Sequence, residues 1–161
     1  MKELEFNANQ YVKVSLTAHG RWVLRYWDGD ALGVPNVDAV GRLEMQMFEV
    51  MDIFGKRISK GCQQIFDTNM VLCLSCPEGG LRLKEVGKFN TNQYVKVKLT
   101  QHGHLVMSNF YTDIPSYMPS VDEGGYIKVQ MLHLMRIFGE HMSRGAEPVF
   151  DMNMILCMEG E

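Results

Sequence analysis

Hydrophobic and polar residues alternate in two short segments of the chain that have nearly the same sequence. The segments are residues 11–16 and residues 94–99. Their apolar positions are Val12, Val14 and Leu16 in the first segment and Val95, Val97 and Leu99 in the second. Because successive side chains of a β-strand point to opposite faces, this alternation predicts two strands, each with one face on a core.

The two segments belong to a longer internal repeat. The matched stretches are residues 10–20 with 93–103, residues 51–55 with 135–139, and residues 66–70 with 150–154. A match of this length within one chain indicates a tandem duplication. We predict repeat 1 at residues 1–73, a linker at 74–88 that contains Pro77 and three glycines, and repeat 2 at 89–161. Neither half alone is large enough to hold a comfortable core, so we expect the halves to pack as a pseudo-dimer.

Each repeat also contains a segment with helical periodicity, at residues 43–58 and 127–142. At about 100° per residue the apolar side chains of 127–142 form one wide arc. The core positions predicted from these segments are Met51 and Phe54 in repeat 1 and Met135 and Phe138 in repeat 2. Val129 and Ile137 fall outside the arc, as do their counterparts Met45 and Ile53. This misfit indicates either a second contact, between the two copies, or partly covered surface residues.

The remaining elements complete a β-α-α-β unit. Thr17 and Thr100 occupy positions suited to a helix N-cap. The residues that follow, 21–27 and 104–111, fit a short helix, although their β-forming side chains also allow a returning hairpin strand. We favour the helix. Closing strands are expected at 66–73 and 150–157, so the predicted fold is α+β, with two tandem β-α-α-β repeats packed as a pseudo-twofold pair.

Composition indicates a globular protein without strong electrostatic steering. Of the 161 residues 46% are hydrophobic and 22% are charged, and the net charge is −3. This charge gives no sign of binding to duplex nucleic acid, which basic domains favour. No secretory signal and no membrane-length apolar run is present, so we expect a cytoplasmic protein with reduced cysteines. The 13 methionines suit core filling or an adaptable binding surface.

The candidate catalytic and metal-binding motifs are all incomplete. Cys73 and Cys76 form a C-x-x-C pair, but Cys157 has no partner three residues on, and a structural zinc site needs four ligands. We therefore expect Cys73 and Cys157 to be buried small hydrophobes. His19 and His102 are each followed by glycine, which suggests a turn, and a catalytic base would need a nucleophile and an orienting partner. We predict no enzyme activity, no cofactor and no metal.

Two Asp-x-Asn pairs begin the predicted closing strands. They are Asp67 with Asn69 and Asp151 with Asn153. Calcium needs six or more oxygen ligands, and no loop of this sequence supplies them. We expect these side chains to hydrogen-bond to neighbouring backbone.

The polar faces of the alternating strands are the best candidate binding surface. The polar face of the first strand carries Tyr11 and Lys13, and the polar face of the second strand carries Tyr94, Lys96 and Lys98. An aromatic and basic surface can stack a base and hold a phosphate, but an ordinary solvated strand has the same composition. His19 and His102, matched between the repeats, complete the candidate binding residues. A nucleotide held between the two copies would meet Lys13, Lys96 and these histidines.

Three motifs recur in both repeats and carry a resemblance to a known group of proteins. They are Y-V-K-V-x-L-T-x-H-G, Q-M-x-x-[VL]-M-x-I-F-G and F-D-x-N. The chain resembles short phage and prophage proteins of unassigned function, which usually carry one copy of this unit. The resemblance implies a phage accessory protein in the host cell cytoplasm that binds a host or phage protein stoichiometrically, as inhibitors of host defences do. The alternatives are a nucleotide-sequestering protein and a phage structural component.

Overall fold

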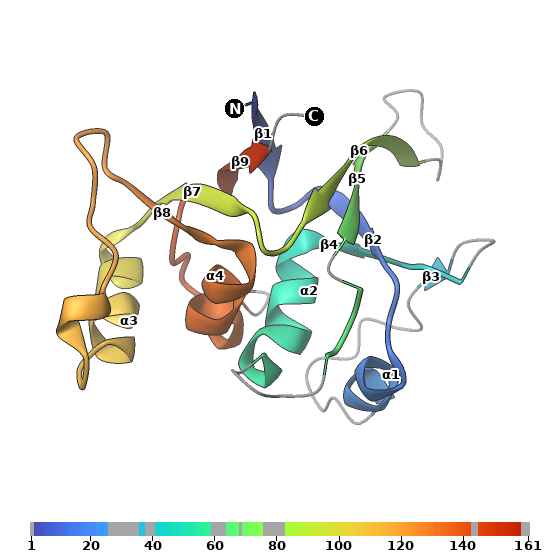
Figure 1. Ribbon diagram of the computed structural model, residues 1–161, viewed down its shortest axis with the longest axis horizontal. Helices are drawn as coiled ribbons and strands as arrows, with labels where there is room; N and C mark the ends of the chain where they lie inside the picture. Colours follow the sequence, from blue (N-terminus) through green and yellow to red (C-terminus); the bar gives the residue numbers. More distant parts are fainter. Residues whose placement is uncertain are drawn as a thin grey trace.

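The computed structural model describes residues 2–25, 36–37, 41–58, 64–67, 69–75, 83–142 and 145–158. The fold is α+β, as predicted, with two antiparallel sheets on one side and four α-helices in a row on the other (Figure 1). The strands are β1 (Lys2–Asn7), β2 (Tyr11–Val14), β3 (Asn36–Val37), β4 (Leu43–Gln46), β5 (Asn69–Ser75), β6 (Leu83–Asn90), β7 (Tyr94–Lys98), β8 (Tyr126–Gln130) and β9 (Asn153–Met158). The helices are α1 (Ala18–Arg25), α2 (Met47–Phe54), α3 (Gln101–Phe110) and α4 (Met131–Phe138), with 3-10 turns η1 (Gly55–Arg57), η2 (Pro115–Tyr117) and η3 (Gly139–His141).

The two sheets exchange strands between the halves of the chain. One sheet has the order β3-β4-β2-β5-β6 and the other has the order β1-β9-β7-β8. β1, at the start of the first half, pairs with β9 at the end of the second half, whereas β6 pairs with β5. Leu83–Lys88, predicted as linker, therefore belong to a strand of an antiparallel pair; residues 76–82 lie outside the described part. Pro77 and its neighbouring glycines, which indicated a linker, gave no sign of the strand that follows them.

The chain crosses from one sheet to the other at two matched turns, residues 8–10 and 91–93. Each turn also supplies acceptors to the first amides of a helix, which have no partner inside the helix. The Ala8 carbonyl accepts from Phe48 N at 3.0 Å, and the Gln10 carbonyl accepts from Met47 N at 2.9 Å. Thr91 and Gln93 accept in the same way from Leu132 and Met131, both at 3.0 Å. The crossing turns therefore fix where α2 and α4 begin.

The central helices begin later than predicted. Leu43–Gln46 and Tyr126–Gln130 are the strands β4 and β8, and helix starts only at Met47 and Met131. Met45 and Val129 are buried because they lie on the inner faces of these strands, which explains why neither fitted a helical arc. The second half therefore has the order β-β-α-β-α-β, and the first half has the same order with the short strand β3 added before β4. The predicted β-α-α-β unit leaves out two strands that both halves contain.

The two halves meet backbone to backbone at matched glycines. α2 contacts α4 and η3, and α4 contacts η1. A Cβ atom on Gly55 would lie 2.4 Å from the Met135 carbonyl oxygen, and one on Gly139 would lie 2.5 Å from the Met51 oxygen. Ile53 and Ile137, the other two residues that misfit the arc, are buried in these helices. A side chain at either glycine would hold the helices apart.

The predicted core is largely confirmed. Nine of the ten predicted positions are buried, and Leu16 is half-buried against the core. The first α-element of each half is the helix rather than the hairpin strand. Thr17 and Thr100 are its N-caps, since each hydroxyl accepts a hydrogen bond from the amide of the glycine three residues on, at 3.1 Å.

Candidate functional site

The motifs shared by the two halves are accounted for by the fold. Gly20 lies in the first turns of α1, and a Cβ atom there would lie 1.9 Å from the Ile65 carbonyl oxygen. Gly103 faces Val149 in the same way, at 1.7 Å. The predicted His-Gly turn is therefore a helical segment whose glycine admits a neighbouring carbonyl.

The aspartates of the two Asp-x-Asn pairs accept hydrogen bonds from neighbouring backbone amides, as predicted. Asp67 Oδ1 accepts from Asn69 N and Asp151 Oδ1 accepts from Asn153 N, each at 3.1 Å. The asparagines then bond across the exchanged strands: Asn7 donates to Asn153 at 2.8 Å, and Asn90 donates to Asn69 at 3.0 Å.

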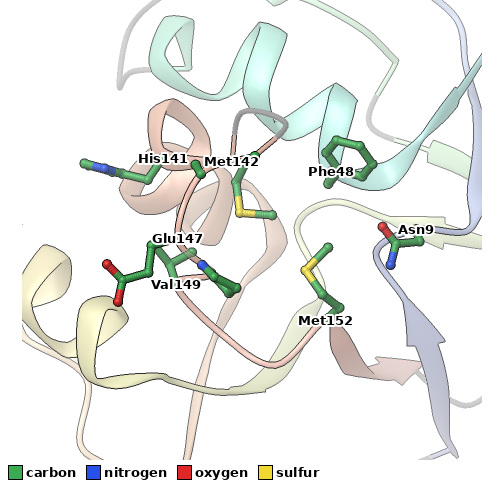
Figure 2. A pocket seen from close by; sticks show the side chains of 10 residues that line it. Asn9, Phe48, His141, Met142, Glu147, Val149 and Met152 are labelled. Atoms are coloured by element: carbon green, nitrogen blue, oxygen red, sulfur yellow. The ribbon is translucent and has the colours of Figure 1, made fainter.

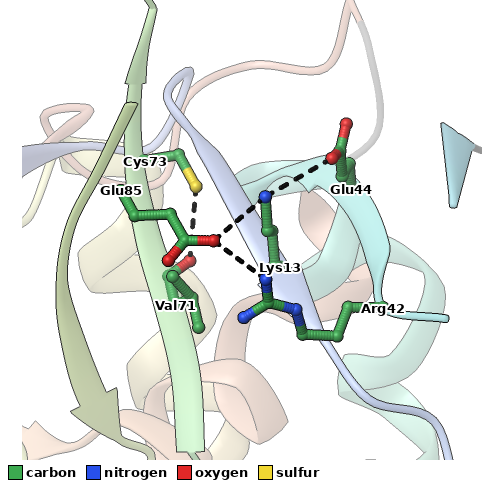
Figure 3. A network of polar contacts seen from close by, with 6 residues as sticks. All are labelled: Lys13, Arg42, Glu44, Val71, Cys73 and Glu85. Atoms are coloured by element: carbon green, nitrogen blue, oxygen red, sulfur yellow. Dashed lines mark hydrogen bonds and ion pairs between the residues drawn. The ribbon is translucent and has the colours of Figure 1, made fainter. Parts of the chain in front are cut away.

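On the first predicted binding face, Lys13 is held by carboxylates (Figure 3). Lys13 Nζ lies 3.1 Å from Glu85 and 3.6 Å from Glu44, and Arg42 also reaches Glu85 at 2.8 Å. The hydrogen bond from Lys13, followed by that from Arg42, lowers the pKa of Glu85. The same Glu85 bond raises the pKa of Lys13. Lys13 therefore belongs to an ion-pair network within the protein.

Cys73 lies beneath this network and is buried. Burial raises the pKa of its thiol, which disfavours the reactive thiolate. Cys73 and Cys157 are both free and buried, consistent with the small-hydrophobe interpretation. Cys76 lies outside the described residues, and the described residues contain no group of three potential metal ligands.

The second predicted face has a different charge arrangement. Lys96 Nζ lies 2.5 Å from Glu3 of β1. In the other sheet Glu85 occupies the position that matches Glu3. It does so because the register of the β5–β6 pair shifts between Leu72 and Cys73, which leaves Val86 without a pairing partner. Lys98 is exposed, and Tyr94 is 48% exposed with Lys128 Nζ 5.4 Å from its ring centroid.

The structure does not bring the predicted binding residues together around one cavity. α1 and α3, which carry His19 and His102, lie at opposite ends of the row of helices (Figure 1). His19 stacks on Trp22, with ring centroids 5.9 Å apart. His102 Nδ1 lies 3.9 Å from Glu147, and its ring is 6.1 Å from that of His141. Tyr11 is half-buried beside Lys13 on the first strand face.

A cavity of about 300 Å³ lies next to His141 and Glu147 (Figure 2). Both halves line it: Asn9 and Phe48 from the first, and the segment around Met142 and Met152 from the second. The two methionine side chains extend into it, whereas His141 and Glu147 point outward in Figure 2. The cavity is therefore mainly apolar.

Among the described residues, six of the exposed large apolar side chains lie along α3 and the segment that follows it in sequence. They are Leu105, Phe110, Ile114, Tyr117, Met118 and Val121, here called the α3 surface. Tyr117 is 73% exposed and Leu105 is 61% exposed. The chain has no Lys or Arg between Leu99 and Ile127, but it has Asp113, Asp122 and Glu123 there. This segment is therefore apolar and acidic, while Arg136 of α4 places a positive charge beside Phe110.

The α3 surface rests on a buried polar pair. The Tyr111 hydroxyl and His133 Nε2 form a hydrogen bond at the contact between α3 and α4. Arg136 lies 5.7 Å from the Phe110 ring centroid. Burial, and then the charge of Arg136, lowers the pKa of His133. These contacts fix the end of α3, so the exposed side chains after it have a firm base.

Sequence reasoning did not find the α3 surface. Residues 112–125 contain Gly, Pro and Asp, which are typical of loops and draw attention away from Ile114, Tyr117 and Val121. The sequence signal for this surface was the number of large apolar residues in a segment that has neither helical nor strand periodicity.

Comparisons with protein-family models, with curated proteins and with solved structures found no match. None of the described helices is long and apolar enough to cross a membrane.

Proposed function

We propose that the protein is a non-enzymatic phage accessory protein that acts by stoichiometric binding of another protein, as a host-defence inhibitor does. The α3 surface is the observation that supports this proposal. Exposed large apolar side chains in such number are typical of protein interaction sites, and aromatic side chains such as Tyr117 and Phe110 are enriched in interfaces.

The charge of the surface specifies the partner. Asp113, Asp122 and Glu123 lie in the segment after α3, and Arg136 of α4 lies beside Phe110 at its other end. The acidic part complements a groove that is apolar at its centre and basic on the facing part of its rim. Charges at a rim act mainly on association rate and its salt dependence. The partner is therefore a host or phage protein with a basic-rimmed apolar groove, acting in the host cytoplasm.

We also propose that the architecture arose by tandem duplication of one unit. Two tandem units form an intramolecular pseudo-twofold pair, supported by matched pairing in the two sheets. Val12 pairs with Leu72 as Val95 pairs with Leu156. A bridge joins Leu16 to Phe66, and a second joins Leu99 to Phe150. The α3 surface then belongs to the second unit.

A comparative pulldown tests the proposal. The purified chain and two variants are used as bait in a lysate of phage-infected bacteria. The double variant Leu105→Ser with Tyr117→Ser should lose a partner that the wild type holds at near-equimolar yield. The control Val86→Ser changes an exposed apolar residue of β6 and should keep that partner.

Substitutions of exposed residues change stability by about 0.5 kcal/mol or less, so equal melting curves show that the variants are folded. Capture should also weaken as salt rises. A partner retained equally by all three baits would show that another surface binds it, and no equimolar partner would overturn the proposal.

A further inference from the structure

Five side chains gather on the outer face of β7 and β8, here called the β7–β8 face. They are Tyr94, Lys96, Lys98, Tyr126 and Lys128. The intervening residues Val95, Val97, Ile127 and Val129 are buried on the inner face. Lys96 lies directly opposite Lys128, and Lys98 directly opposite Tyr126. The sequence prediction contained only the β7 half of this face, because it assigned most of β8 to a helix.

The opposed lysines are a feature that the fold does not need. Like charges directly opposite on a sheet are destabilising. In the other sheet the matched pair is Lys13 opposite Glu44, which are 3.6 Å apart. The second half thus replaces an attractive pair with a repulsive one. Violations of a local rule such as this one are expected at functional sites.

Part of this positive charge is compensated. Glu3 pairs with Lys96, the charge of Lys128 also helps to lower the pKa of Glu3, and Asp122 contributes to raising the pKa of Lys96. Lys98 and Lys128 have no ion-pair partner among the described residues. Two ammonium groups are therefore available to an anion outside the protein.

Aromatic rings lie beside these two ammonium groups. Tyr94 is 48% exposed and adjoins Lys128, while Tyr126 is half-buried opposite Lys98. Surfaces that combine exposed aromatic rings with lysines bind single strands, because bases stack on the rings and phosphates meet the cations. An acidic peptide would pair with the lysines but would have no bases to stack on the rings of Tyr94 and Tyr126.

We propose that the β7–β8 face binds single-stranded nucleic acid, with bases on Tyr94 and Tyr126 and phosphates at Lys98 and Lys128. Asp122 adjoins both this site and the α3 surface, but the proposed contacts to nucleic acid use none of the exposed apolar side chains of the α3 surface. The net charge of −3 makes the binding weak and sensitive to salt. Two phosphate contacts to a single strand predict a slope of about −1.4 for the logarithm of the binding constant against the logarithm of salt concentration.

The decisive variant is Lys128→Glu, which recreates the charge pairing of the other sheet. It should raise the melting temperature and weaken binding of a fluorescently labelled ten-thymidine DNA strand by tenfold or more, measured by anisotropy at low salt. Lys88→Glu, on an exposed position of β6, makes the same change in net charge and should leave binding nearly unchanged. Tyr94→Ser should weaken binding about tenfold, and Tyr94→Phe should restore it.

Three results would overturn the proposal. They are no binding by the wild type, an equal loss in Lys88→Glu, and competition by polyglutamate as effective as that by unlabelled DNA. The last result would identify a site for acidic peptides. Because Lys128→Glu is expected to be the more stable protein, loss of binding there cannot come from unfolding.

Discussion

Single positions at which the two halves differ carry most of the information about function. Lys128 stands where the first half has Glu44, and His133 stands where it has Glu49. Thr91 stands where the first half has Ala8, and its fully buried hydroxyl has no hydrogen-bond partner among the described groups. Nothing in the structure explains Thr91. The other two substitutions belong to the β7–β8 face and to the base of the α3 surface.

The histidine makes stability depend on pH in a defined direction. Its pKa is lowered from 6.5 in the folded protein, so below about pH 6.5 the unfolded chain binds more protons at this site. The free energy of unfolding should therefore fall as pH falls from about 6.5 to the folded pKa. Denaturant melts between pH 7 and pH 5 should show this fall in the wild type and a smaller one in His133→Gln.

The acidic groups act in a separate pH range. Ion pairs lower the pKa values of Glu3 and Glu85 from 4.5, so their contribution to stability is lost only below about pH 4.5. An unchanged pH profile in His133→Gln would show that His133 is not desolvated in the folded protein.

Residue-level patterns were readable from sequence where backbone geometry alone sets them. The alternation of Val12 and Val14 predicted their burial, and threonine at positions 17 and 100 predicted the N-caps. The partners of Lys13 and Lys96 were not readable. Glu85 and Glu3 reach them only through strand exchange and a bulge, which depend on contacts between residues far apart in sequence.

At the scale of elements, the prediction failed where a strand runs directly into a helix. Leu43–Gln46 and Met47–Phe54 are continuous, with no glycine or proline between them to mark the change. Their apolar residues satisfy a period of two and then a period near 3.6, so a single helical window covers both with a few misfits. The repeated misfits at Met45 and Val129 were the signal of the strand.

The contact between α2 and α4 yields a prediction for Gly139. Gly139 has helical φ and ψ, so alanine there would ordinarily stabilise a helix. Because a Cβ atom would lie 2.6 Å from Gly55 Cα, we expect Gly139→Ala to lower the free energy of unfolding by at least about 1–3 kcal/mol. Urea melts measure this change.

Gly87 in β6 provides the control, since a Cβ atom there meets nothing within 4 Å. Gly87→Ala should be neutral or slightly stabilising. A stabilising effect of Gly139→Ala would show that the halves are not in backbone contact.

At the scale of the molecule, strand exchange joins the two halves into one folding unit. Each sheet contains a strand from near the start of the opposite repeat, so neither predicted repeat holds a complete sheet. Sheet pairing across such distances was beyond the sequence patterns, which report local period but not which edge a strand joins. The chain passes from one sheet to the other at the turns 8–10 and 91–93.

Strand exchange predicts that removing β1 damages the far half of the chain. Phe6 is 1% exposed and packs in the common core, and loss of a buried Phe side chain alone costs about 3–5 kcal/mol. A chain without residues 1–7 should therefore be less stable by at least this amount. In this truncated chain the backbone amides of β9, the pairing partner of β1, should lose protection from hydrogen exchange before the amides of β5 in the other sheet.

A circular permutation should restore what the truncation removes. Lys2 lies directly opposite Met158 in the antiparallel pair β1–β9, so residues 159–161 can lead into Lys2 through a short hairpin connection. The permuted chain starts at Ala8 and ends at Asn7. In this chain β1 follows β9 directly, just as β6 follows β5 in the other sheet. We expect its denaturant midpoint to return close to that of the wild type. If the permuted chain were no more stable than the truncated one, β1 would not pair with β9, and the exchanged arrangement of the sheets would be incorrect.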